Sequence, residues 1–273
     1  MATHSLRLNR NTVAAAVAAA TLLGLTGAAS SAVIPRSGSS VTGRTIVVPI
    51  LMYHRIDYLR PSLPAITRRL TVDPGDFAQQ MRWLHDNGFH TLTQRELLAA
   101  LRNQQALPAR PVLVTFDDGY RDVLGKASPV IERLGLHATA YVISGRLRGT
   151  DPSFLTVPEL RVLEQRGIEI GSHTVDHANL PSLDDTQALA ELTTSRETLE
   201  RAVGHAVPWF AYPYGAYDAR VAALVAQAGY LTAVTTDSGS CQPTQRPLEL
   251  ERLEVLDTTG VAGLAAMLSG ASC

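Results

Sequence analysis

Seven short apolar runs recur along this chain, and segments with helical spacing of apolar residues separate most of them. The strand-like runs lie at 47–53, 112–116, 138–143, 168–172, 209–212, 231–235 and 250–255. Helical spacing or capping signals lie at 76–87, 94–101, 128–134, 158–165, 185–203 and 219–227. Strands that alternate with helices pair in parallel through right-handed crossovers. Seven such strands predict an α/β fold with a closed or nearly closed barrel, without an internal repeat or a second domain.

The size and charge of the chain fit this prediction. It has 273 residues, of which 45% are hydrophobic and 18% are charged, enough for one domain with a sizeable core. The formal net charge is −1, so we expect neither a nucleic acid nor an anionic lipid surface as a partner.

The first residues have the features of a secretory signal peptide rather than of folded structure. Arg7 and Arg10 precede an apolar, alanine-rich run at 12–27, and small residues follow it. The run is short for a membrane span, so we expect cleavage, no stable membrane insertion afterwards, and a secreted or cell-envelope-associated protein. An uncleaved anchor is the alternative. The predicted organisation is a signal peptide at 1–32, a flexible linker at 33–45 and one folded domain at 46–273.

The chain has two cysteines, Cys241 and Cys273, and both lie outside the motifs described below. In an oxidising compartment an even pair predicts a disulfide bond. Two unpaired thiols are the alternative, and neither interpretation makes these residues metal ligands.

Two adjacent carboxylates, Asp117 and Asp118, follow the apolar run 112–116 directly. At the end of a buried strand, neither stays ionised without a metal, a cation or hydrogen bonds. His173 and His177 end a second such run. One Asp with two His is the ligand set of a hydrolytic divalent-metal site with an open position, with Zn²⁺ expected first and Co²⁺ or Ni²⁺ as alternatives. We therefore predict Asp118, His173 and His177 as ligands; the alternative is a helix-capping Asp and two surface histidines.

Three motifs occur in order, each after a strand-like run: Phe-Asp-Asp-Gly at 116–119, His-Thr-Val-Asp-His at 173–177, and Phe-Ala-Tyr-Pro-Tyr-Gly at 210–215. They resemble the motifs of the polysaccharide deacetylases, the NodB-homology or carbohydrate esterase family 4 group, and the resemblance runs from about residue 47 to the C-terminus. The early segment Pro-Ile-Leu-Met-Tyr-His-Arg-Ile at 49–56 is similar to the poly-N-acetylglucosamine deacetylase branch. The resemblance implies a distorted (β/α)₇ barrel.

The general base and the general acid of amide hydrolysis are predicted in two different motifs, the one at 116–119 and the early segment at 49–56. Asp117, left free by the metal, is the candidate general base for a water that attacks an acetamide carbonyl. Most of the family carries its catalytic histidine in a late Leu-x-x-x-His motif, but no histidine follows His205 here. In the poly-N-acetylglucosamine branch the early Tyr-His motif takes this role, which makes His54 the candidate general acid.

The third motif implies an oxyanion site and also departs from the family pattern. Family members use the backbone N–H at the position of Tyr214 to hold the oxyanion, a contact worth roughly 3–4 kcal/mol; a Pro-Gly turn with packed aromatic rings is the alternative. Where most of the family has an arginine that orients the base, this chain has Ala211. Arg252, near the end of the last strand-like run, is a candidate replacement.

These features together predict a secreted, metal-dependent N-deacetylase, with its catalytic domain at 46–273. We expect a monomer that acts on an N-acetylated polysaccharide similar to poly-N-acetylglucosamine and releases acetate. One alternative is the same chemistry on peptidoglycan, chitin or O-acetyl xylan. The other is a catalytically weak, carbohydrate-binding member of the same fold, suggested by Ala211.

Overall fold

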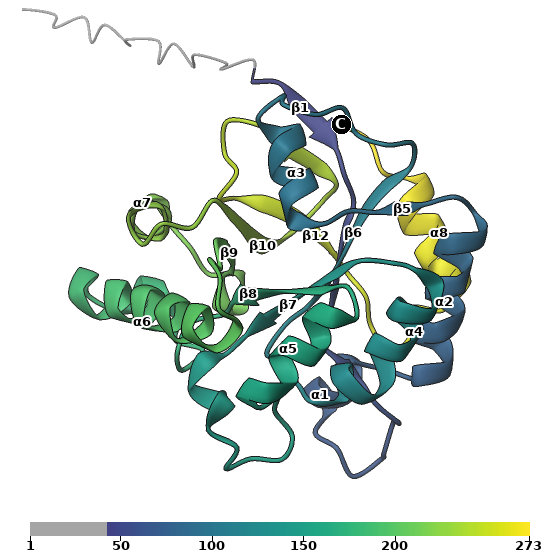
Figure 1. Ribbon diagram of the computed structural model, residues 1–273. Helices are drawn as coiled ribbons and strands as arrows, with labels where there is room; N and C mark the ends of the chain where they lie inside the picture. The colour runs from purple at the N-terminus through teal and green to yellow at the C-terminus, as the bar shows by residue number, and fades with distance from the viewer. Residues whose placement is uncertain (1–42) are drawn as a thin grey trace, which may run out of the picture. The chain divides into compact units, whose positions relative to one another are not determined.

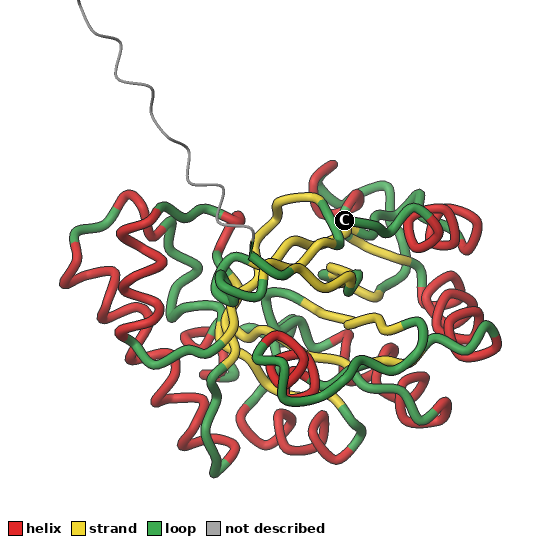
Figure 2. The backbone as a smooth tube through the Cα atoms, turned by 90° about the horizontal axis from the view of Figure 1, so that it is seen from above, coloured by secondary structure: helices red, strands yellow, loops and turns green. Residues whose placement is uncertain are grey.

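The structure is a computed structural model, and it describes residues 43–273. Seven parallel strands close a barrel that helices surround (Figure 2). The barrel strands are β2 (Ile50–Tyr53), β6 (Pro111–Phe116), β7 (Ala138–Val142), β8 (Ile168–Ser172), β9 (Trp209–Ala211), β10 (Thr232–Ser238) and β12 (Leu250–Glu254). Their order in space is β2-β12-β10-β9-β8-β7-β6, and β6 pairs back with β2. The seven predicted runs are these strands, so the prediction of a (β/α)₇ barrel is confirmed.

The prediction of one continuous strand over 47–53 is wrong. β1 (Thr45–Val47) pairs antiparallel with β11 (Cys241–Pro243), and β2 begins only at Ile50. Pro49 has no N–H to donate to a ladder, and the chain changes partners there. Three two-residue strands were also not predicted, because they are too short to show a period: β3 (Arg55–Ile56), β4 (Thr71–Val72) and β5 (His90–Thr91).

Eight α-helices are present in residues 43–273. They are α1 (Ala65–Arg69), α2 (Pro74–Asp86), α3 (Gln94–Leu101), α4 (Ser128–Leu134), α5 (Val157–Gln165), α6 (Asp185–Val203), α7 (Ala219–Gln227) and α8 (Val261–Ser269). Thr93 and Glu96 form the predicted capping box before α3. The predicted bounds of α4, α6 and α7 agree with the structure. α1 and α8 were missed, since α1 is one short turn and α8 is apolar on most sides.

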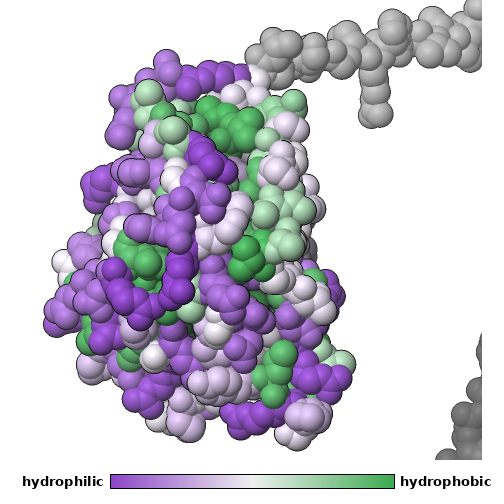
Figure 3. Space-filling model, turned by 90° about the vertical axis from the view of Figure 1, so that its right-hand side faces the viewer, coloured by the Kyte–Doolittle hydropathy of each residue, from purple (hydrophilic) through white to green (hydrophobic). Residues whose placement is uncertain are grey.

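The helices form a wall around the barrel (Figure 1), with α6 and α7 on one side and α2, α4 and α8 on the other. On the face that carries α8, hydrophobic side chains form separate groups among polar ones (Figure 3). None of the helices in the described part of the chain is both long and apolar enough to cross a bilayer.

The two ends of the chain's folded part meet near β1. Cys241 in β11 and Cys273 at the C-terminus form the predicted disulfide bond. The predicted signal peptide at 1–32 lies outside the described residues, as does most of the predicted linker at 33–45. The last residue of that linker prediction, Thr45, already belongs to β1.

Candidate active site

The predicted site residues come together at the carboxyl end of the barrel, where folds of this kind carry their chemistry. They follow or lie in five different barrel strands, β2, β6, β8, β9 and β12, which are far apart in the sequence. One cavity of about 590 Å³ is lined by all of them. The predicted residues in its wall are His54, Asp117, Asp118, His173, His177, Tyr214 and Arg252.

The backbone at this end is bent into conformations that ordinary residues avoid. Asp118, Thr174, His177 and Tyr214 have positive φ angles of 72°, 64°, 59° and 60°. Residues held in this left-handed region cost energy and cluster at functional sites, where surrounding contacts impose them. Gly215 follows with φ 65°, and no other amino acid fits at this position, because its Cβ would lie 2.0 Å from Thr236 Oγ1.

Asp118, His173 and His177 form a cluster that fits a metal ion. Their ligand atoms all lie within 4.8 Å of one another. Asp118 Oδ1 is 3.5 Å from the Nε2 atoms of both His173 and His177. The Nδ1 of His173 lies 2.8 Å from the Ala211 carbonyl oxygen, to which it donates, so the Nε2 lone pair is left for a ligand bond. One carboxylate and two imidazoles, with an open side toward the cavity, match the donor set of hydrolytic zinc sites.

The surroundings shift the pKa values of the two histidines in opposite directions. Burial lowers the pKa of His177 to about 4, and the neighbouring His173 adds to this effect. Burial also acts to lower the pKa of His173, but its contact with Asp118 and the charge of Asp117 outweigh burial and raise it. His177 is thus neutral near pH 7 and can act as a ligand. The negative charges of Asp117 and Asp118, which favour a proton on His173, would equally favour a metal cation bound to its Nε2.

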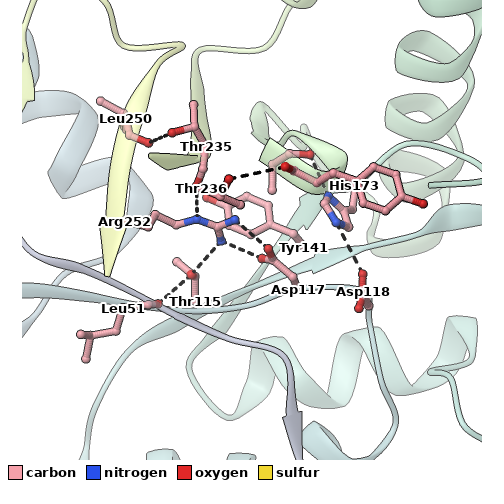
Figure 4. A network of polar contacts seen from close by, with 12 residues as sticks. Leu51, Thr115, Asp117, Asp118, Tyr141, His173, Thr235, Thr236, Leu250 and Arg252 are labelled. Atoms are coloured by element: carbon pink, nitrogen blue, oxygen red, sulfur yellow. Dashed lines mark hydrogen bonds and ion pairs between the residues drawn. The ribbon is translucent and has the colours of Figure 1, made fainter. Parts of the chain in front are cut away.

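Asp117 points away from this cluster and pairs with Arg252 (Figure 4). Arg252 Nη1 and Nη2 donate to Asp117 Oδ1 and Oδ2 at 2.8 and 2.7 Å, a bidentate contact. Arg252 is only 1% exposed, and its Nε donates to the Thr235 carbonyl at 2.7 Å. Burial alone would raise the pKa of Asp117, but the guanidinium outweighs it and holds that pKa well below its usual range. Arg252, in β12, therefore gives Asp117 an arginine contact that Ala211 cannot supply.

His54 and Tyr214 both line the same cavity. His54 follows β2, and its Nδ1 is buried without a hydrogen-bond partner among residues 43–273. The Tyr214 side chain is 66% exposed, and its ring centroid is 4.4 Å from that of His177. The exposed ring of Tyr214 is available to a substrate in the cavity, and the imidazole of His54 lines the same cavity while its Nδ1 stays buried.

Sequence reasoning missed the part of the wall that comes from outside the motifs. α1 contributes Ile66, and Leu70 follows it, while Glu254 closes the cavity from β12. Arg69 ties this segment to the barrel through an ion pair with Glu254 at 2.8 Å. The only signal for this segment was its exposed apolar side chain, Ile66, which a sequence does not distinguish from a buried one.

Comparison with known proteins agrees with this geometry. The sequence model of a family described as polysaccharide deacetylase matches residues 104–233. YxkH of Bacillus subtilis (strain 168), whose name includes polysaccharide deacetylase, is 33% identical over 224 residues, covering 82% of this chain and 76% of that protein. A poly-β-1,6-N-acetyl-D-glucosamine N-deacetylase of Staphylococcus aureus is 21% identical over 202 residues, covering 70% of this chain and 69% of that protein.

Among solved structures, the Streptococcus pyogenes deacetylase PplD in complex with acetate is similar with a TM-score of 0.77 and 28% identity. The match covers 82% of this chain and 99% of that one. Nearly the whole chain of that deacetylase therefore has the same fold as the matched part of this one. Identity to YxkH over most of both chains, together with the motifs gathered at one cavity, shows that the chain belongs to the polysaccharide deacetylase family.

Proposed function

We propose that this protein is a secreted, metal-dependent N-deacetylase that removes acetyl groups from a β-linked N-acetylglucosamine polymer and releases acetate. One observation carries the proposal: a candidate metal cluster, a carboxylate held by a buried arginine and an unpaired imidazole all line one cavity. Amide hydrolysis needs a polarised carbonyl, a base for the attacking water and an acid for the leaving nitrogen. The cavity offers a group for each.

The metal would be held by Asp118, His173 and His177, with Zn²⁺ expected first. When bound, such an ion polarises the acetyl carbonyl and lowers the pKa of a nearby water toward about 7. The chain itself fixes the ligands, because the Ala211 carbonyl orients His173 and the positive φ of His177 directs that residue into the cluster.

Asp117 accepts the proton of the attacking water in this proposal. Arg252 uses one lone pair of each carboxylate oxygen, and each oxygen keeps another lone pair for the proton. The bidentate contact holds the carboxylate plane in one orientation, so the arginine acts as a positioning residue.

His54 then donates a proton to the leaving nitrogen, so that the C–N bond breaks to give acetate and a free amine. The backbone N–H of Tyr214 would stabilise the oxyanion that forms on the former carbonyl oxygen. The exposed ring of Tyr214 would contact the sugar on the open side of the cavity.

The polymer is proposed from relatives and from the early Tyr-His motif. The S. aureus relative is named for poly-β-1,6-N-acetyl-D-glucosamine, although its identity of 21% is low. Deacetylation of peptidoglycan, chitin or O-acetyl xylan is the alternative within the same chemistry. A carbohydrate-binding role without catalysis is less favoured, because Arg252 supplies the contact that Ala211 had put in doubt.

An acetate-release assay tests the proposal. The purified protein would be incubated with Zn²⁺ and with β-1,6-linked N-acetylglucosamine oligomers, chitooligomers or peptidoglycan in parallel. We expect the fastest release from the β-1,6-linked oligomers. Faster release from one of the other polymers would change the substrate, and no release from any acetylated carbohydrate would refute the catalytic function.

A further inference from the structure

The segment that carries both histidine ligands, residues 173–177, lies between α6 and the helical turn Ser144–Arg148. Two of its residues, Thr174 and His177, have positive φ angles, so the segment does not adopt this shape through local preference. Contacts from outside must hold it.

One set of contacts comes from α6. Glu191 Oε2 accepts hydrogen bonds from the backbone N–H groups of Val175 and Asp176, at 2.9 and 3.1 Å. Ser195 Oγ lies one helical turn further and donates to the Thr174 carbonyl at 3.0 Å. Residues four apart share one face of a helix, so α6 presents both groups to the same segment.

The second set comes from the turn on the other side. The N–H of Ser144 donates to the Thr174 carbonyl at 3.0 Å, and the N–H of Gly145 donates to the Val175 carbonyl at 2.9 Å. A Cβ at residue 145 would lie 2.5 Å from that carbonyl oxygen, so only glycine permits the approach. The segment is therefore held from both sides by groups that are not metal ligands.

Glu191 differs from the other groups in carrying a charge. It makes no salt bridge within residues 43–273, and its carboxylate is directed to the two N–H groups between the histidines. Hydrogen bonds to an ionised acceptor are about twice as strong as neutral ones. The control residue on the same helix, Glu197, is exposed and faces Arg201 at 3.8 Å instead.

We propose that Glu191, assisted by Ser195, is a positioning residue that sets the separation of His173 and His177 before a metal binds. This inference rests on the proposed metal site. Without the carboxylate, the Val175 and Asp176 N–H groups lose their acceptor, and the His177 backbone can relax from its left-handed conformation. The two imidazoles then meet the ion in the correct geometry only part of the time, which weakens metal affinity.

The test uses the full chain, freed of metal, with Zn²⁺ alone as the probe. Zn²⁺ affinity is measured by competition with a chromophoric chelator for the parent, Glu191→Ala, Glu191→Gln and the matched controls Glu197→Ala and Glu197→Gln. We expect Glu191→Ala to bind Zn²⁺ roughly 10–100-fold more weakly. Glu191→Gln keeps an acceptor oxygen and should recover part of that loss, whereas both Glu197 variants should bind like the parent.

Thermal unfolding of each metal-free protein separates positioning from folding. If Glu191 is a positioning residue, its substitution should weaken Zn²⁺ affinity by more than the accompanying change in the thermal stability of the metal-free protein can explain. If Glu191→Ala does not fold, Glu191→Gln and Ser195→Ala provide the same comparison. Parent-like affinity in folded Glu191 or Ser195 variants would overturn the inference alone. Failure of the parent to bind Zn²⁺ would overturn the zinc assignment, and the inference with it.

Discussion

The two ends of the barrel both contain buried polar groups, but they use them differently. At the amino end, α3 closes the barrel, and buried Gln94 donates to Tyr141 Oη and accepts from Thr232 Oγ1. These three side chains are neutral and bond to one another, and the Gln94 backbone N–H donates to Glu169 Oε2 at 2.6 Å. At the carboxyl end, Asp117 and Arg252 are buried as ions, and His54 Nδ1 has no partner within the described residues.

The backbone shows the same contrast. Within residues 43–273, four of the six non-glycine residues with positive φ lie at the carboxyl end, and the other two lie in the loop between α3 and β6. Tyr141 fills the barrel between the ends, and its ring leaves room at residue 171 only for glycine. The hydrogen-bonded network at the amino end contributes to the stability of the fold. The buried ions and the left-handed backbone around the cavity at the carboxyl end are suited to catalysis. Substitutions at the two ends should therefore separate stability from turnover.

The largest effect is expected from removal of a metal ligand. His177→Ala leaves an incomplete donor set, so bound metal should be lost and acetate release should fall to near the uncatalysed background. Metal content by elemental analysis and circular dichroism would be measured together. Full metal content in a folded His177→Ala protein would show that the ligand was assigned wrongly.

Substitution of the two neighbouring aspartates, Asp117 and Asp118, should affect two different properties, turnover and metal binding. Asp117→Asn removes the proton acceptor but no ligand, so metal content should stay and turnover should fall by roughly 10²–10⁴-fold. Asp118→Asn should weaken metal binding itself. Equal loss of metal from both variants would contradict the separation of roles across these adjacent residues.

His54→Ala should lower kcat by roughly 10²–10⁴-fold with metal content unchanged. The effect should be larger for an acetamide than for an activated aryl acetate, whose leaving group needs little protonation. The two substrates would be compared on the same preparation. If both lose activity equally, His54 is structural and another proton donor must exist.

Arg252→Met should affect stability and turnover together. It leaves Asp117 as an uncompensated buried charge, which costs roughly 3–5 kcal/mol in the free energy of unfolding. The carboxylate also loses its fixed orientation. Urea denaturation and acetate release would be measured in parallel, and a variant that keeps the parent's turnover would remove Arg252 from the mechanism.

The smallest effect is expected at the amino end. Gln94→Met leaves Tyr141 Oη and Thr232 Oγ1 without their partner, which costs roughly 1–3 kcal/mol of stability. Turnover per folded molecule should match the parent, because no cavity residue is touched. A large loss of turnover at a temperature where the variant is folded would mean that the two ends are coupled through Tyr141.

Much of this molecule could be predicted because its signals are local. The seven barrel strands are apolar runs, α6 shows its period over its full length, and each candidate ligand directly follows or closely follows a strand. Strand ends at one side of a parallel barrel must meet, so Asp118 and His173 could be brought together from sequence alone.

What could not be predicted depends on contacts between distant residues. Arg252, which pairs with Asp117, is 135 residues away from it, and the sequence could name it only as a candidate near the end of a strand-like run, without showing the contact. Glu191 looks like any polar residue on an amphipathic helix, since its partners are backbone N–H groups. Short strands such as β4 exist only through pairing and carry no pattern of their own.

The central claim is that a metal at the carboxyl end of the barrel makes this chain a deacetylase. Acetate release from β-1,6-linked N-acetylglucosamine oligomers would be followed in the parent before chelation, after removal of metal, and after stoichiometric Zn²⁺ is restored, with Asp117→Asn as the folded, metal-loaded control. Activity should disappear with the metal, return with Zn²⁺ and stay roughly 10²–10⁴-fold below the parent in the control. Undiminished acetate release by the metal-free parent would contradict the claim.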